Sequence, residues 1–206
     1  MGRQAVIFVT THPGRVETEA SLGAARRLGL DVVVLGPRGL ELTAGACADW
    51  IEVDVADTLA VVLAAQEVAI RREVAGVVGW TDDAVPVVAR VAAALDLPGH
   101  PVEAADRVVD RARLHARLDE AAPGVAPRWG RPGELDLPVV LKPVCGGGLR
   151  VLTDAGELEQ IVETGGDWIV EELVEGSAHT VDGFVQDGRL LGAEVTDAWA
   201  RGSGLV

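Results

Sequence analysis

The sequence predicts an α/β protein: a parallel sheet with flanking helices, followed by a smaller α+β unit built on an antiparallel sheet. In the first half of the chain, strand-like apolar runs alternate with helical patterns, which is typical of parallel strands connected by helices. From Leu137 onward, strand patterns follow one another with a single helical pattern between them. We therefore expect a first domain over residues 1–100, a helical linker over 101–136 and a second domain over 137–206.

The first predicted domain begins with a continuous apolar run at residues 5–9, as expected for a strand buried on both faces. A helical pattern follows over residues 17–28 and ends at Gly29. The remaining elements expected here are strands at 31–35 and 50–55, a helix at 58–74, a strand at 75–80 and a helix at 82–95.

Parallel sheets of this kind bind ligands beyond the carboxyl ends of their strands. Thr10 and Thr11 follow the first predicted strand and Thr81 follows the fourth, so these three residues are candidate substrate contacts. Thr81-Asp82 also fits an N-cap for the next helix, which is the interpretation we favour. His12 is interpreted as an ordinary loop histidine. The first loop lacks G-x-G-x-x-G, so no dinucleotide site is assigned.

The rest of the chain begins with a helical, arginine-rich segment at 102–122 and a proline-rich connector at 124–138. Apolar strand patterns follow at 137–141 and 149–152, and a helix is expected at 155–162 after the cap Thr153-Asp154. Further strands are expected at 168–173, 178–186 and 189–196, with Asp187-Gly188 as the hairpin turn between the last two.

Lys142 stands near the end of the 137–141 strand pattern, and a loop containing Gly146, Gly147 and Gly148 follows it. Glycines let backbone N–H groups approach anionic oxygens without a side chain in the way. The lysine supplies a mobile positive charge for the same oxygens. The segment therefore suits a flap over phosphates. It equally suits a β-hairpin with a flexible turn and a lysine that extends to solvent.

A second motif lies downstream, where an apolar strand ends in Glu171-Glu172-Leu173-Val174 and a glycine turn leads to Thr180-Val181-Asp182-Gly183. Together with Lys142-Pro143 and the glycine loop, this order resembles the ATP-grasp superfamily. It is most similar to the carboxylate–amine ligase branch, related to D-alanine–D-alanine ligase and biotin carboxylase. The resemblance implies a Rossmann-like pre-ATP-grasp domain at 1–100 and an incomplete ATP-grasp nucleotide-binding subdomain at 137–206.

The resemblance also implies roles in binding ATP. Lys142 and the three glycines would contact its phosphates, and the segment from Glu171 through Glu172 and Leu173 to Val174 would hold the adenine edge. Arg111 would stand where the family has a phosphate-contacting lysine. From the residues alone, Glu171 and Glu172 also fit salt-bridged edge acids. Arg111 also fits a solvated helix face, paired with Asp110 or Glu120.

The sequence departs from the family pattern at several positions. Ala178 replaces the acid expected on the ribose hydroxyls, for which Glu175 or His179 could substitute. The family uses Mg²⁺, but its metal ligands are not found; Glu194 and Asp197 are thin candidates, and no catalytic residue is assigned. Trp199 and Leu205 are apolar near the end of the chain, with no following element to cover them.

We therefore expect a truncated, degenerate or partner-completed ligase that activates a carboxylate as an acyl phosphate for attack by an amine. The alternatives are a non-catalytic protein that binds a nucleotide or a partner, and a self-associating structural module.

Composition limits the partners and the location. The net charge of −14 argues against nucleic acid and against an anionic membrane surface. No apolar run approaches the roughly 20 residues of a membrane span, and no signal-peptide pattern is present. Cys47 and Cys145 show no metal-ligand spacing, which favours reduced thiols in the cytoplasm.

Overall fold

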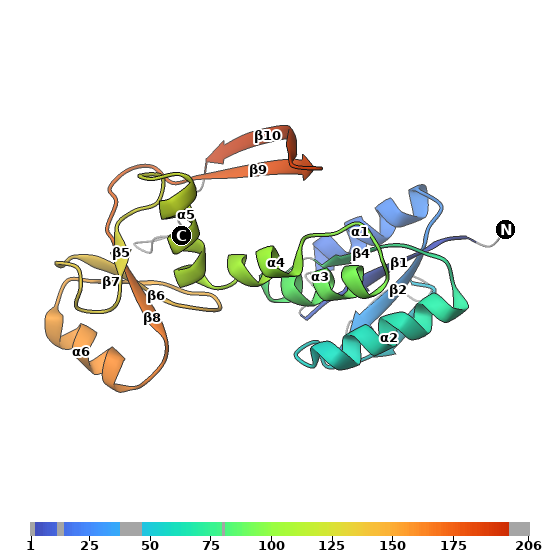
Figure 1. Ribbon diagram of the computed structural model, residues 1–206, viewed down its shortest axis with the longest axis horizontal. Coiled ribbons are helices and arrows are strands. Elements are labelled where there is room, and N and C mark those ends of the chain that lie inside the picture. Colours follow the sequence, from blue (N-terminus) through green and yellow to red (C-terminus); the bar gives the residue numbers. More distant parts are fainter. Residues whose placement is uncertain (1–2, 12–14, 38–46, 80, 198–206) are drawn as a thin grey trace. The chain divides into compact units, whose positions relative to one another are not determined.

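The computed structural model describes residues 3–11, 15–37, 47–79 and 81–197 (Figure 1). The chain divides into two compact units, Met1–Arg117 and Leu118–Val206, and each is described by itself below. Three residues discussed above, His12, Trp199 and Leu205, lie outside the described residues, as does Trp80, the last residue of the strand predicted at 75–80.

The first unit contains a parallel four-stranded sheet, as predicted. Its strands are β1 (Ala5–Val9), β2 (Asp31–Gly36), β3 (Asp49–Glu52) and β4 (Val74–Gly79), in the order β3-β2-β1-β4. The central strand β1 pairs in parallel with β2 on one side and with β4 on the other. The strand order therefore reverses at β1, and open α/β sheets bind ligands beyond the carboxyl ends of their strands at such a point.

Helices cover both faces of this sheet (Figure 1). Alternate residues of β1 and β2 point to opposite faces. Ile7, Val9 and Leu35 pack with α2 (Thr58–Arg71) and α3 (Val85–Ala94), whereas Phe8 and Val34 pack with α1 (Arg15–Arg27). Each such side chain contributes about 1.5–3 kcal/mol when fully buried. Burial on both faces explains why these strands are continuous apolar runs rather than alternating ones.

Several boundaries in the first unit differ from the sequence prediction. Helix α2 ends at Arg71, because Arg72 is extended and its guanidinium pairs with Asp31 at 3.0 Å. Strand β3 ends at Glu52 rather than at residue 55. The single helix predicted over 102–122 is two helices, α4 (Val102–Val108) and α5 (Arg111–Ala121). The break lies at Asp110, whose carboxylate accepts from the backbone N–H of Arg113 at 3.0 Å and so caps α5.

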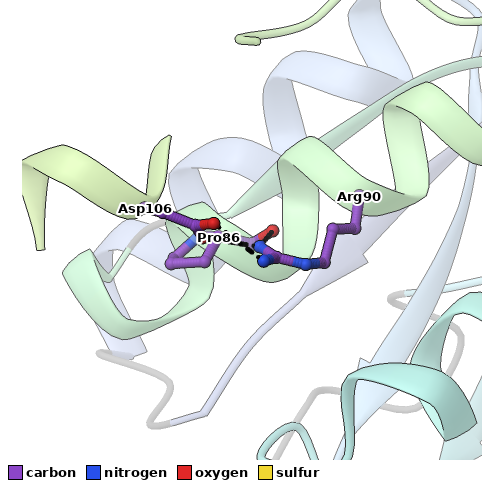
Figure 2. A network of polar contacts seen from close by, with 3 residues as sticks. All are labelled: Pro86, Arg90 and Asp106. Atoms are coloured by element: carbon purple, nitrogen blue, oxygen red, sulfur yellow. Dashed lines mark hydrogen bonds and ion pairs between the residues drawn. The ribbon is translucent and has the colours of Figure 1, made fainter. Parts of the chain in front are cut away.

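An ion pair joins α3 to α4 (Figure 2). Arg90 donates from Nη1 and Nη2 to the two carboxylate oxygens of Asp106, at 2.7 and 2.8 Å. Nη1 also donates to the carbonyl of Pro86 at 3.0 Å. The guanidinium hydrogen bonds hold the pKa of Asp106 below its usual value. Bidentate geometry of this kind fixes orientation as well as charge.

We expect Asp106→Asn to remove part of the acid sensitivity of the first unit. A depressed pKa means that the pair stabilises the fold above the pKa of an unpaired aspartate, about 4, and that this contribution is lost as the pH falls through the lower folded value. Urea midpoints measured from pH 7 to pH 2 should differ between wild type and variant at neutral pH and converge in acid. A constant difference across that range would show that the pair does not act through its charge.

The second unit contains an antiparallel sheet with strands in the order β5-β8-β6-β7. These are β5 (Trp129–Gly130), β8 (Trp168–Glu172), β6 (Val139–Pro143) and β7 (Arg150–Leu152). Helix α6 (Ala155–Glu163), capped by the Asp154 carboxylate, packs Leu158 against Val139, Leu141 and Val170. Strand β5 was not predicted, because two residues in a proline-rich segment carry no periodic pattern.

The remaining strands form a separate two-stranded hairpin, β9 (His179–Gln186) and β10 (Arg189–Asp197). Asp187 and Gly188 both have positive φ, 50° and 72°, as the predicted turn requires. All residues of both strands are exposed. One face of the hairpin, called the apolar hairpin face below, contains the cross-strand pairs Val181–Val195 and Val185–Leu190.

None of the helices within the described ranges combines the length and apolar character needed to span a bilayer.

Candidate functional site

Lys142 lies on β6 directly beside Glu171 on β8. The register pairs Val140 with Glu171 and Lys142 with Ile169, so the two charged side chains share one face of the sheet. Lys142 Nζ donates to Glu171 Oε2 at 2.7 Å. Glu171 is buried, with 6% of its surface exposed, while the Lys142 side chain keeps 25% exposure. Lys142 is also the only lysine in the sequence.

Glu172, the next residue, points to the opposite face and has a different partner. Its carboxylate accepts from the backbone N–H of Arg128 at 3.0 Å and from Arg128 Nε at 2.7 Å. These two hydrogen bonds, the backbone one first, hold the pKa of Glu172 below its usual value. Both acids are therefore salt-bridged, as the alternative interpretation expected, and they differ in burial: Glu171 is buried and Glu172 is not.

The glycine loop follows β6 and leads into β7. Gly146 and Gly148 have φ of 89° and 95°, a region that side-chain-bearing residues rarely adopt. A Cβ added at Gly146, Gly147 or Gly148 would meet nothing within 4 Å, so the loop is open on its outer side. Among the described residues, the backbone N–H groups of Gly147 and Gly148 have no hydrogen-bond acceptor. These N–H groups are therefore available to an anionic ligand.

The predicted adenine-binding segment continues past the end of a paired strand. Strand β8 ends at Glu172, and Leu173 and Val174 lie beyond its last ladder pair. Val174 is exposed. The backbone of this segment is thus free of sheet pairing where the resemblance expects a purine edge.

Arg111 is the first residue of α5 and belongs to the first unit, whereas Lys142 belongs to the second. The first turn of α5 also carries Arg113 and contains no acidic residue. The Asp110 carboxylate, which caps α5, lies beside these two cations and offsets their charge at the helix N-terminus. The phosphate role that the resemblance implies for Arg111 therefore stays a prediction.

The three candidate threonines gather at the carboxyl edge of the parallel sheet. The hydroxyl oxygens of Thr11 and Thr81 lie 3.0 Å apart, and Thr11 donates to Asp83 Oδ1 at 3.0 Å. Thr81 stands at the N-cap position before Asp82–Ala84, but its side chain makes no capping hydrogen bond. The N-cap interpretation therefore explains where Thr81 lies but not what its hydroxyl contacts, because the hydroxyl lies beside that of Thr11 instead of capping the helix.

A cavity of about 260 Å³ opens beside these threonines. It lies beyond the carboxyl ends of the strands and is lined by Thr11, Pro37, Asp54, Val55, Ala56 and Asp83. The sequence analysis did not make these two acids candidate contacts. Asp83 lies on the same edge, after the fourth predicted strand, whereas Asp54 was placed inside the strand predicted at 50–55 and follows a strand only because β3 ends at Glu52.

A chain of polar contacts at the base of the hairpin was also not predicted. Ser177 Oγ lies 2.7 Å from His179 Nε2, and His179 Nδ1 lies 3.0 Å from Asp197 Oδ1. Both ring nitrogens of His179 therefore have partners within this segment. The contacts hold the first residue of β9 to the last residue of β10. The His179 imidazole is therefore already engaged within the hairpin, whereas the sequence analysis considered it as a substitute for the acid that contacts the ribose hydroxyls.

Comparison with known proteins decides the fold. The family profile described as the ATP-grasp N-terminal domain matches residues 22–99. L-amino acid ligase from Bacillus licheniformis superposes with a TM-score of 0.76 at 19% identity, over 99% of this chain and 54% of that chain. The chain has the ATP-grasp fold.

Two further solved structures share the fold of this chain. Phosphoribosylglycinamide synthetase from Anaerococcus prevotii gives a TM-score of 0.71 at 18% identity, over 98% of this chain and 53% of that chain. N5-carboxyaminoimidazole synthetase from Staphylococcus aureus, solved with ADP, gives 0.73 at 14% identity, over 97% and 56%. The chain thus spans about half the length of the solved structures it matches. No curated protein sequence matches it.

The described residues of this ATP-grasp fold do not fit a Mg²⁺ site. Within those residues, no group of three or more His, Cys, Asp or Glu side chains is placed to hold a metal ion. Glu194 faces Asp182 across the hairpin, and Asp197 is engaged by His179. Mg²⁺ takes near-octahedral oxygen ligands, which these acids do not supply. By contrast, Lys142 and the open loop N–H groups fit the phosphates of a nucleotide.

Proposed function

We propose that the chain binds ATP at Lys142 and the glycine loop, and that it serves a carboxylate–amine ligase reaction. The observation that carries the proposal is the single lysine, held by a buried carboxylate at the rim of a loop with unpaired N–H groups. A lysine ammonium has three N–H donors. Glu171 takes one of them, which leaves two for phosphate oxygens.

The parts of the nucleotide would then meet different parts of the chain. Phosphate oxygens would accept from Lys142 Nζ and from the N–H groups of Gly147 and Gly148. The adenine edge would pair with the backbone of Leu173 and Val174, beyond the end of β8, with Glu171 and Glu172 preceding it. Among these groups Glu171 acts as a positioning residue, because it fixes the lysine that reaches the phosphates.

The chemistry proposed is the formation of a carbon–nitrogen bond through an acyl phosphate. A carboxylate oxygen attacks the terminal phosphorus of ATP, and ADP leaves. An amine then attacks the acyl carbon, and phosphate leaves with the carboxylate oxygen. This chain's residues would bind and orient the phosphates. No step is assigned to a metal ion here, since the described residues do not fit one.

A second candidate function is a nucleotide-binding protein that needs another polypeptide, or a second copy, for activity. The apolar hairpin face favours it, because Val181 and Val195 are each 66% exposed. A two-stranded hairpin with a bare apolar face is marginally stable by itself. A cytoplasmic location is proposed for either candidate, consistent with the two free cysteines.

The test is calorimetric titration of ATP into the wild-type chain and into two matched glycine variants. Gly148→Val forces a side chain into a positive-φ position, whereas Gly147→Val adds the same side chain where φ is not positive and no atom lies within 4 Å. Strain of about 1–3 kcal/mol at residue 148 should reshape the loop. We expect ATP affinity to fall at least tenfold in Gly148→Val and less in Gly147→Val.

Failure of the wild-type chain to bind ATP at millimolar concentration would overturn nucleotide binding by this chain alone. Binding without turnover, followed by turnover when a second polypeptide is added, would favour the second candidate over a self-sufficient ligase.

A further inference from the structure

Helix α2 is apolar on both its inner and its outer side. Ten of its fourteen residues are apolar, and between its two ends it carries one charged side chain, Glu67. A helix on the surface of a globular unit usually has a polar outer face, whereas a helix that is apolar all round is normally covered on every side. On the inner side, Val61, Ala65 and Val68 are buried in the core of the first unit. The apolar outer side remains to be explained.

The outer side carries a narrow line of residues, called the α2 stripe below. Its members follow one another at spacings of four, three and four residues, which places them along one side of the helix: Leu59, Leu63, Gln66 and Ile70. The three apolar members are 67%, 52% and 84% exposed. Figure 1 shows α2 (teal) on the outside of the first unit. Alternating spacings of three and four apolar positions are typical of a helix that packs along another helix.

Helix α3 shows how the chain covers such a helix when it supplies the cover itself. It is as apolar as α2, and it packs against α2 and β4 and also against α4, whose Ala105 is buried. The elements that pack most closely against α2 are β2 and α3, and they leave the α2 stripe exposed. The stripe is therefore accessible to another molecule.

The α2 stripe is complementary to itself when two copies run in opposite directions. Leu59 and Ile70 lie equally far from the middle of the stripe, and so do Leu63 and Gln66. An antiparallel arrangement about a two-fold axis therefore brings Leu59 level with Ile70 of a second copy. It brings Leu63 level with Gln66 in the same way. An interface of this isologous kind closes as a dimer.

Charges at the ends of α2 favour the same orientation. Asp54 and the capping residue Asp57 lie at its N-terminal end. Arg71 and Arg72 lie at its C-terminal end. Antiparallel pairing brings the acidic end of one copy to the basic end of the other, whereas parallel pairing would place like charges together. The stripe itself carries no charge, so the net charge of −14 opposes association only at longer range, where salt screens it.

We propose that the α2 stripe binds a second copy of this chain, with the two α2 helices antiparallel across a two-fold axis. The stripe is roughly 17 Å long, and one helix pair of that length buries less than the about 1,200–2,000 Å² of a standard interface. The dimer is therefore weak, with a dissociation constant of about 0.01–0.5 mM. This surface is distinct from the apolar hairpin face, and its pairing does not require ATP.

The experiment is sedimentation equilibrium of the full chain in 0.15 M NaCl, at about 0.01–1 mM protein. Ile70→Gln removes one apolar side chain from the stripe of each copy. Leu28→Gln is the matched control, because Leu28 is 75% exposed in the same unit and lies outside the stripe. Gln66→Leu makes the stripe apolar throughout, and a gain in affinity cannot come from a failure to fold.

We expect the dissociation constant to rise about tenfold or more in Ile70→Gln and to fall about fivefold or more in Gln66→Leu, since each substitution acts twice in the dimer. It should stay unchanged in Leu28→Gln. Arg71→Glu should raise it about threefold or more, because like charges would then meet at the helix ends. An unchanged constant in Arg71→Glu would overturn the antiparallel orientation.

A second set of results decides between this surface and the hairpin. Val181→Thr combined with Val195→Thr makes the apolar hairpin face more polar and should leave the dimer intact. Loss of the dimer in this variant, with retention in Ile70→Gln, would assign association to the hairpin and overturn the proposal. A wild-type chain that stays monomeric up to about 1 mM would overturn it as well. ATP binding, measured in parallel, tests the nucleotide site independently of these outcomes.

Discussion

Replacing Lys142 with methionine is expected to abolish ATP binding and to destabilise the second unit. The substitution removes the cation proposed for the phosphates. It also leaves Glu171, 6% exposed, without the partner that lies 2.7 Å from its carboxylate. Loss of one member of a buried ion pair costs about 3–5 kcal/mol, and the partial exposure of Lys142 places the expected loss near the lower limit.

A double variant separates the two effects. Lys142→Met with Glu171→Gln has no buried charge, so we expect it to recover much of the stability measured by urea unfolding while still failing to bind ATP. Arg150→Met is the control for loss of a cation from the same sheet. Its pair with Glu157, at 3.2 Å, is exposed on both sides and should contribute less than about 1 kcal/mol. ATP binding at wild-type affinity in the stable double variant would rule Lys142 out as a phosphate ligand.

Gly36→Ala should destabilise the first unit more than most single substitutions in its sheet. An added Cβ would lie 2.4 Å from the carbonyl oxygen of Thr10 and 3.2 Å from Thr10 Cγ2. Because the nearest atom is backbone, β1 and β2 would have to separate at their carboxyl ends. The Gly36 carbonyl also accepts from the Trp50 indole at 3.3 Å and from Val53 N–H at 3.2 Å. We expect a loss of about 1–3 kcal/mol or more, seen as a fall of several degrees in the melting temperature.

Gly76→Ala provides the matched comparison, because Gly76 lies in β4 of the same sheet and an added Cβ there meets nothing within 4 Å. Alanine is favoured over glycine within a strand by about 0.5–1 kcal/mol, so this variant should melt at or slightly above the wild-type temperature. Equal melting of the two variants would contradict the close approach of Thr10 to Gly36.

The sequence predicted the elements well where burial imposes a period. The parallel strand at Ala5–Val9 and the turn at Asp187-Gly188 are confirmed, because the first needs two-sided burial and the second needs positive φ. The break at Asp110 was missed. The Asp110 side chain bonds to the backbone N–H of Arg113, and this starts a new helix instead of continuing the preceding one. The spacing of apolar residues, on which the prediction was based, contains no information about such a side-chain bond. Helix ends such as Arg71 depend on a tertiary ion pair with Asp31.

The candidate site could be predicted in its residue types but not in its pairings. Glu171 and Glu172 must point to opposite faces of a strand, yet their partners, Lys142 and Arg128, come from distant parts of the sequence. The register between β6 and β8 decides which acid meets the lysine, and register is not readable from a single strand. The same holds for Asp54 and Asp83, which share a cavity only because β3 and β4 belong to one sheet.

The single lysine also determines how the protein responds to amine-directed reagents. Most proteins carry many reactive amines, and such labelling averages over all of them. In this sequence Lys142 is the one side-chain amine, and its Nζ donates a hydrogen bond to a buried carboxylate. Covalent tagging, acetylation or coupling to a sensor surface would therefore modify either the chain's α-amino group or Lys142 itself. A preparation immobilised through Lys142 would report no nucleotide binding even if every molecule were folded, whereas the labelling rate in solution would report directly on the state of the Lys142–Glu171 pair.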